Sequence, residues 1–403
     1  MEKKQRLTLS ILLMNLFIAF LGIGLVIPVL PTLMNELNIS GTTVGYLTAA
    51  FALTQLIMSP FAGKAADRFG RKIMIVIGLF IFGLSEFLFG FGKTIEVLFL
   101  SRILGGVSAA FIMPAVTAFI ADITTMETRP KALGYMSAAI STGFIIGPGI
   151  GGFLAEIGTR VPFYSAGVLG TVAAILSIIL LREPERSTEV FEENEASGKS
   201  GLRKVLMPMF LIAFIVIFVS SFGLAAFESF FSLYVDHKFA FTPADIAIAI
   251  TGGAILGAIA QVALFDPMMK RLGEINLIRW MLILSAILVF AMTLANSYWM
   301  IMLVTFTVFI GFDLIRPAVT TYLSRIAGSD QGFVGGMNSF FTSLANVFGP
   351  VIGGMLFDID INYPYYFATV FILAGLAIAM FWKDPAMQKR NRKEAVVAEK
   401  VMQ

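Results

Sequence analysis

The sequence has no cysteine, a single histidine and few charged residues. With no cysteine among its 403 residues and only His237 as an imidazole, disulfides, thiolate metal sites, cysteine nucleophiles and multi-histidine metal centres are excluded. Only 14% of the residues are charged, whereas 58% are hydrophobic and the mean hydropathy is +0.87. A chain this apolar does not stay soluble as an ordinary globular domain. The composition therefore predicts an integral membrane protein.

Twelve apolar stretches are each long enough to cross a bilayer, which takes about 20 residues of helix. Because lipid offers no hydrogen bonds to the backbone, each stretch is expected to be a helix. The sequence thus predicts an all-α membrane protein with twelve transmembrane helices. The expected spans are 7–34, 41–62, 73–92, 97–121, 132–157, 162–181, 205–234, 244–265, 275–295, 298–323, 332–357 and 365–381.

Two internal repeats divide the chain into halves. Met113-Pro114-Ala115-Val116-Thr117 returns as Arg316-Pro317-Ala318-Val319-Thr320, and the Gly-Pro-x-x-Gly-Gly pattern at 147–152 returns at 349–354. Parallel repeats of this size are typical of transporters whose substrate site lies near the bilayer midplane between two bundles. We expect pseudo-symmetric six-helix bundles at 1–181 and 205–383, an acidic cytoplasmic linker at 182–204, and a basic cytoplasmic tail at 384–403.

The basic residues are distributed unevenly about these spans. Of the 29 Lys and Arg, 24 fall on the side of the N-terminus, counting Arg279 near the end of its span, three on the other side (Lys93, Arg160 and Lys238) and two deeper within spans (Arg102 and Arg316). Since basic loops stay in the cytoplasm, both termini are expected there. The first apolar run is too long for a signal peptide and has no clear cleavage site, so it is interpreted as a retained span.

Several ionisable residues interrupt the apolar stretches. Asp313 and Arg316 are three residues apart and so share one helix face. They are either a self-neutralising structural pair or part of a transport site, since charges at bilayer depth usually face a cavity, a partner or an ion pathway. Glu228 lies among phenylalanines, where burial disfavours the charged form and lets a carboxyl hold a proton near neutral pH. The role of Glu86, in the third span, is left open.

Three glycine-containing motifs have a physical interpretation of their own. The loop from Gly63 to Lys72 combines turn-forming glycine with one carboxylate among arginines. It is either a cytoplasmic latch that involves Asp122 or an ordinary basic loop. The fourth span carries Leu98-x-x-x-Arg102-x-x-Gly105-Gly106. The fifth carries Gly143-x-x-x-Gly147-Pro148-x-x-Gly151-Gly152, a smooth stripe for close helix contact with a proline that permits a bend.

These motifs resemble the signature loop, the fourth-helix motif and the exporter-specific fifth-helix motif of the major facilitator superfamily. Phe20-Leu21-Gly22-Ile23-Gly24-Leu25-Val26-Ile27-Pro28, Ala226-Phe227-Glu228 and Gly311-Phe312-Asp313-x-x-Arg316-Pro317 look like the bacterial multidrug exporters of the Bmr and NorA type. The resemblance implies a proton-coupled antiporter of the bacterial cytoplasmic membrane that expels hydrophobic, often cationic drugs such as dyes, fluoroquinolones and quaternary ammonium compounds. It also implies a monomer, with the proton as coupling ion and no other cofactor, metal or nucleic-acid partner.

The resemblance assigns roles to individual residues. Proton and cation coupling falls to Glu228 and Asp313. Because the repeat places the uncharged Ala110 and Met113 where the second half has Asp313 and Arg316, Arg316 is expected to tune Asp313 rather than only neutralise it, and Arg102 is expected to be an electrostatic modulator. The expected cavity residues are Phe20, Ile23, Gln55, Phe144, Phe309 and Asn346. The expected gating residues are Gly63, Asp67, Arg68, Gly70, Arg71, Asp122, Gly143, Gly147, Pro148, Gly151 and Gly152.

Two other classes of function compete with this hypothesis. A substrate-specific exporter on the same fold, for example of polyamines, would also use two carboxylates. A membrane enzyme is disfavoured because the sequence shows no nucleotide loop, metal cluster or nucleophile–base arrangement, and its glycine pairs lie inside spans.

Overall fold

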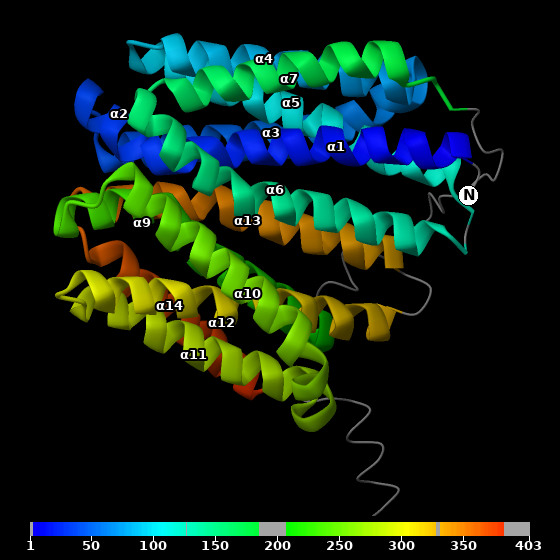
Figure 1. Cartoon of the computed structure of the whole chain (residues 1–403). Coiled ribbons are helices and arrows are strands. Elements are labelled where there is room, and N and C mark those ends of the chain that lie inside the picture. The colour runs from blue at the N-terminus through cyan, green and yellow to red at the C-terminus, as the bar shows by residue number, and fades with distance from the viewer. Residues whose placement is uncertain (1–2, 126, 185–206, 328–330, 383–403) are drawn as a thin grey trace, which may run out of the picture.

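The computed structural model describes residues 3–125, 127–184, 207–327 and 331–382, and within them every regular element is a helix (Figure 1). Twelve helices are long and apolar enough to cross a membrane, as the sequence predicts. Most of the predicted linker and all of the predicted basic tail lie outside the described residues.

The first half comprises α1 (Lys3–Val26), η1 (Ile27–Val29), α2 (Leu30–Leu37), α3 (Gly41–Phe69), α4 (Arg71–Phe91), α5 (Ile95–Ile123), α6 (Arg129–Ile157) and α7 (Val161–Leu180). The second half comprises α9 (Pro208–Phe239), α10 (Pro243–Leu272), α11 (Glu274–Leu294), α12 (Tyr298–Ala327), α13 (Gln331–Phe357) and α14 (Tyr363–Met380).

The first span differs from its predicted form. A single helix was expected over residues 7–34, but α1 ends at Val26 and a 3-10 turn at Ile27–Val29 leads into α2. Pro28 and Pro31 cause this break, because each lacks the N–H that a continuing helix would use. Elsewhere several helices outrun their apolar stretches: α9 continues to Phe239 and α10 to Leu272. Hydropathy marks the part in hydrocarbon, whereas the helix itself extends into the polar boundary.

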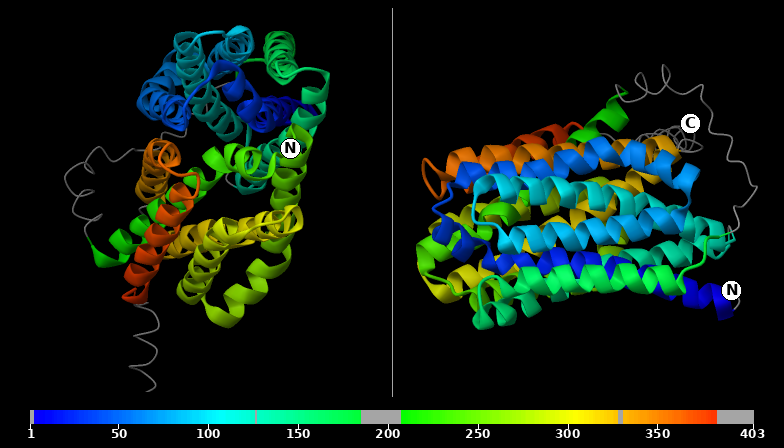
Figure 2. Two further views of the ribbon diagram at one scale, coloured as in Figure 1. Left: turned by 90° about the vertical axis from the view of Figure 1, so that its left-hand side faces the viewer. Right: turned by 90° about the horizontal axis from the view of Figure 1, so that it is seen from above.

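The helices form two groups that face each other. In Figure 1 the first half lies above the second with the helix axes running across the picture, and Figure 2 shows the same grouping end-on. Within the first half, α1 packs on α6 and α7, and α4 packs on α5 and α7. Within the second, α9 packs on α13 and α14, and α11 packs on α12 and α14. The two halves meet chiefly where α3 contacts α13 and where α6 contacts α10.

These contacts between halves are concentrated at one end of the helices. We call the end at which α1 begins the N-terminal face and the other end the opposite face. Near the opposite face a side chain at Gly45 would overlap the Pro350 carbonyl, and one at Gly152 would overlap Ala247 of α10. Near the N-terminal face, Gly63, Gly134 and Gly336 have nothing within 4 Å of the position of a Cβ. The close contacts between the halves therefore lie near the opposite face, which we also call the closed face, whereas these glycines near the N-terminal face adjoin open space.

A carboxylate joins the two halves at the closed end. Asp358, just after α13, accepts hydrogen bonds from the backbone N–H groups of Gly41 at 2.7 Å and Thr42 at 2.9 Å. These donors are among the unpaired N–H groups that every helix N-terminus presents, here that of α3. The amide of Asn35 adds a second bridge by donating to Asp236 at 3.0 Å. We call Asp358 with its two N–H donors the Asp358 latch.

The Asp358 latch gives a prediction about the closed face. Because the chain has no cysteine, a single cysteine at Ile27, which lines the space inside the closure, reports on opening when an impermeant maleimide is added from the opposite face. Asp358→Ala removes both bonds and is expected to raise labelling several-fold. Complete opening is not expected, since the carboxylate is exposed and its interactions are weakened by water.

Asp360→Ala is the matched control for this prediction. Asp360 lies two residues further along the same loop, but within the described part of the chain its carboxylate accepts hydrogen bonds only from Asn362. It should leave labelling at position 27 unchanged. Equal labelling in the two variants would contradict a closing role for Asp358.

Candidate functional site

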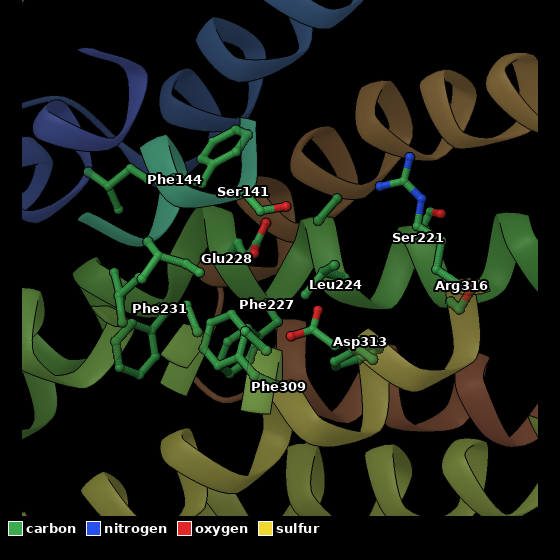
Figure 3. Close-up of a pocket in the computed structure, with 18 of the residues that line it drawn as sticks. Ser141, Phe144, Ser221, Leu224, Phe227, Glu228, Phe231, Phe309, Asp313 and Arg316 are labelled. Atoms are coloured by element: carbon green, nitrogen blue, oxygen red, sulfur yellow. The ribbon is translucent and has the colours of Figure 1, made fainter. Parts of the chain in front are cut away.

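A cavity of about 400 Å³ lies between the halves. The first half contributes Ile27 and one face of α6, whereas α9, α10, α12 and α13 of the second half form most of the wall (Figure 3). Glu228, Asp313 and Arg316 are the charged residues among those that line it. The internal surface is otherwise apolar, with a few hydroxyl and amide groups, as expected for a small-molecule site.

The two acids come from different helices and face the same space. Figure 3 shows the carboxylates of Glu228 on α9 and Asp313 on α12 directed into the cavity. In the part of the chain that the structure describes, neither carboxylate accepts a hydrogen bond or joins an ion pair. Arg316 lies on the same face of α12 as its spacing predicts, but its guanidinium points away from Asp313, towards Ser221. The pair does not neutralise itself by direct contact in this structure.

Aromatic rings form much of the remaining wall. Phe144 and Phe309, both predicted, line the cavity together with Phe227 and Phe231. Phe227 meets Phe309 edge-on with centroids 5.9 Å apart and lies 5.4 Å from Phe231. Such faces accept flat rings and cations without fixed hydrogen-bond geometry.

The six predicted cavity residues fall into two sets. Phe144, Phe309 and Asn346 line the cavity. Phe20 and Ile23 instead line a small separate space inside the first half, although the Phe20 ring packs on Phe144 with centroids 5.0 Å apart. Gln55 is half-buried where α3 crosses α5 beside Gly106.

The structure also adds polar residues that sequence reasoning missed. Ser141, Ser220, Ser221, Gln261 and Thr342 line the cavity. Helical spacing offered one signal, because Ser221 and Ser220 lie about two turns before Glu228 on α9 and therefore share its face. Gln261 offered another, as an amide within an apolar span.

Ion pairs connect the loop between α3 and α4 to α5. Arg71 pairs with Asp67 in the preceding turn and with Asp122 of α5, the latter at 3.3 Å. Gly70 has a φ of +106°, a region that favours glycine. The carboxylate of Glu183, which sequence reasoning missed, occupies the place of a Gly70 side chain and accepts from the N–H groups of Arg71 and Lys72. The loop is thereby fixed to the end of α7.

Two other predicted gating residues of this region lie on α3. The Arg68 guanidinium is 5.4 Å from the centroid of the Phe69 ring. Gly63 has open space around it.

The glycine stripe of α6 serves two different contacts. Side chains at Gly143, Gly147 and Gly151 would overlap the backbone of α1, so these three glycines join helices of the same half. Gly152 faces α10 of the other half, and Pro148 lines the cavity. One helix therefore connects the first bundle, the second bundle and the cavity.

Glu86 and Arg102 lie together but away from the cavity. Glu86 on α4 is 4% exposed, and Arg102 on α5 is close enough to interact with it electrostatically. The Arg102 guanidinium stacks on Phe89 with its carbon 4.0 Å from the ring centroid. Among the described residues, Oε2 of Glu86 and Nη2 of Arg102 are buried with no hydrogen-bond partner. They are a second set of ionisable residues, inside the first bundle.

Two facing helical halves with a charged, aromatic cavity between them are typical of membrane transporters. The sequence model of the Major Facilitator Superfamily matches residues 12–237 and 213–402. The chain belongs to this superfamily.

Known relatives agree with this assignment. The chain is 68% identical over 392 residues to multidrug resistance protein 1 of Bacillus subtilis (strain 168), covering 97% of this chain and 100% of the relative. It is 50% identical over 375 residues to the quinolone resistance protein NorA of Staphylococcus aureus, covering 93% and 96%. A crystal structure of a bacterial homolog of the human lysosomal transporter Spinster, in an inward-facing and occupied conformation, superposes with a TM-score of 0.80 at 16% identity, covering 95% and 97%. This last likeness concerns the fold alone.

The pair inside the first bundle gives a prediction about stability. Among the described residues no ion pair joins Glu86 to Arg102, but each acts on the other electrostatically, and burying either one without the other leaves its desolvation cost uncompensated. Arg102→Met is therefore expected to lower the melting temperature of the purified protein, and Glu86→Gln in the same chain to recover much of the loss. Lys93→Met, at an exposed site in the α4–α5 loop, is the control. A double variant no more stable than Arg102→Met would contradict electrostatic compensation between Glu86 and Arg102.

Proposed function

We propose that the chain exports structurally diverse hydrophobic and often cationic drugs in exchange for protons. The observation that carries the proposal is the placement of two unpaired carboxylates, from α9 and α12, in an aromatic-walled cavity between the halves. The names of the relatives support it, since one is a multidrug resistance protein and another a quinolone resistance protein. Dyes, fluoroquinolones and quaternary ammonium compounds are the substrate classes that fit this chemistry.

The cycle follows from competition for the two acids. With the cavity open towards the N-terminal face, Glu228 and Asp313 attract an amphipathic cation while the phenylalanines bury its rings. The halves then rock, so that the cavity opens at the opposite face. Protons entering there neutralise the carboxylates and release the drug, and the protonated protein returns. Contacts with the phenylalanine faces of the cavity need no fixed hydrogen-bond geometry, so the same cavity suits many ligands.

The remaining predicted roles belong to the same proposal. Arg316 tunes Asp313, and Arg102 modulates the field of the first bundle. The loop residues around Arg71 and the glycines of α6 serve the rocking motion. We place both termini in the cytoplasm of a bacterial cell, so that the open N-terminal face collects drug from inside, and we propose a monomer with the proton as its coupling ion.

The energy available depends on how many protons cross. Each unit of pH difference supplies about 1.4 kcal/mol per proton, and each net charge adds about 2.3 kcal/mol per 100 mV of membrane potential. Exchanging one proton for one monovalent cation moves no net charge. Membrane potential therefore contributes to export of such a cation only if both acids are protonated in each cycle.

A polyamine exporter is the second candidate, because two carboxylates in one cavity also suit a polycation. The phenylalanine wall favours the drug hypothesis, since polyamines have no ring to bury there.

The first prediction from this proposal concerns the two acids. Glu228→Gln and Asp313→Asn keep side-chain size but remove the exchangeable charge. Each is expected to abolish ethidium efflux driven by a pH gradient in vesicles, while the amount of protein in the membrane stays unchanged. Glu156→Gln alters an exposed acid at the end of α6 and should transport normally. Full efflux by both cavity variants would rule out proton coupling at these acids.

The second prediction separates the two candidate substrates. A multidrug cavity should let structurally unrelated compounds compete, so that a fluoroquinolone and a quaternary ammonium compound each inhibit ethidium efflux. Phe309→Ala should change the inhibition constants of the two compounds by different factors, since they use the ring differently. Inhibition by spermidine alone would favour the polyamine exporter.

A further inference from the structure

The Asp313 carboxylate rests against the backbone of a neighbouring helix. Gly257 of α10 is buried, and a methyl group placed on it would overlap Oδ2 of Asp313. The hydrogen that Gly257 carries in place of a side chain therefore points at this oxygen, a contact of the Cα–H···O kind. The absent side chain leaves a recess in α10, and the carboxylate occupies it.

The internal repeat shows that this recess belongs to the second half. With the repeat offset that relates Pro114 to Pro317, Gly257 corresponds to Thr54 and Asp313 to Ala110. In the first half the close approach is reversed, because Gly106 of α5 is the small residue that lies against Thr54 and its neighbours on α3. The small residue therefore lies on α5 in the first half and on α10 in the second half, where the facing helix carries the acid. Simple helix packing requires a small residue on one side, but not on the side that faces Asp313.

The recess determines which charged side chains the Asp313 carboxylate can contact. The charged groups that line the cavity with it are Glu228 from α9 and Arg316 from its own helix, while α10 and α13 contribute the uncharged Gln261 and Asn346. A spacing of three residues allows Asp313 and Arg316 to pair, yet no ion pair joins them in the described structure. Figure 3 shows the carboxylate turned towards α9 and α10 and the guanidinium turned the other way.

We propose that Gly257 is a positioning residue whose recess holds the Asp313 carboxylate apart from Arg316, and so leaves it available to a proton or a cation. A side chain at position 257 expels the carboxylate from α10 into the cavity, where Arg316 captures it. The availability to protons and cations rests on the proposed function, whereas the separation of the two charges does not.

The test measures the carboxyl group itself rather than transport. Dicyclohexylcarbodiimide is an apolar reagent that modifies protonated carboxyl groups in apolar surroundings, and mass spectrometry of the purified full-length protein quantifies its adducts at each acid. In Gly257→Ala, labelling of Asp313 is expected to fall several-fold with labelling of Glu228 unchanged, because an ion pair with Arg316 keeps Asp313 charged. Adding Arg316→Met to this variant is expected to restore labelling. Methionine is chosen because the equivalent position of the first half is Met113.

Gly252→Ala is the matched control. It adds the same methyl group to α10, but there the methyl meets the end of the Phe306 ring rather than a carboxylate, so labelling of Asp313 should be unchanged. Should Gly257→Ala not fold, Asp313→Glu tests the same point with α10 intact, since the longer side chain carries its carboxyl past the recess to Arg316 and should lose labelling likewise.

Two results would overturn the inference: wild-type labelling of Asp313 in Gly257→Ala, or a loss that Arg316→Met does not restore, which would mean that the methyl group only blocks the reagent. Failure of the proposed function is a separate result. It would show as full dye efflux by Asp313→Asn, whatever the labelling pattern.

Discussion

The cost of a charge in hydrocarbon is the constraint on which the rest of the structure depends. A carboxylate at mid-membrane depth costs roughly 2.5–3.5 kcal/mol on insertion scales, so Glu228 and Asp313 need a cavity, and a cavity needs walls. The chain supplies them with two helical halves that touch near the opposite face and have the cavity between them. The two-half architecture therefore provides the cavity that the charged site requires.

Close backbone contact is the second requirement, because halves that rock must have a surface on which to close. Glycine provides it at the opposite face, where α3 meets α13 at Gly45 and α6 meets α10 at Gly152. Such contacts are apolar and weak in membranes, where lipid competes equally with protein for apolar surface. Polar bonds at the same end, from Asp358 to the start of α3 and from Asn35 to Asp236, add a directional component. Breaking these bonds leaves the contacts within each bundle intact, as the proposed rocking motion requires.

The fold was largely predictable from the sequence, whereas the site was only partly so. Span number and the two halves follow from hydropathy and repeats, since both are properties of long stretches. The break at Pro28 was missed because its neighbours remain apolar across it. Phe144, Phe309 and Asn346 line the cavity as predicted, but Phe20 and Ile23 face inward in the first bundle. Helical periodicity says which residues share a face; it does not say whether that face meets its own bundle or the other. Glu183 was missed for a similar reason, because its contact with Gly70 joins segments far apart in the chain.

The repeat comparison explains why the two halves carry different chemistry. Glu86 and Arg102 are buried within the first bundle, where each lies in the field of the other. Glu228, Asp313 and Arg316 line the cavity from the second. Among the described residues no ion pair joins Glu86 to Arg102 or Asp313 to Arg316, so the two sets differ in their place, inside one bundle or at the cavity. The recess opposite Asp313 has no counterpart at Thr54, where the small residue is Gly106 of α5. In the positioning role proposed for Gly257, the missing side chain on α10 keeps the Asp313 carboxylate out of direct contact with Arg316, which then acts on it only from a distance.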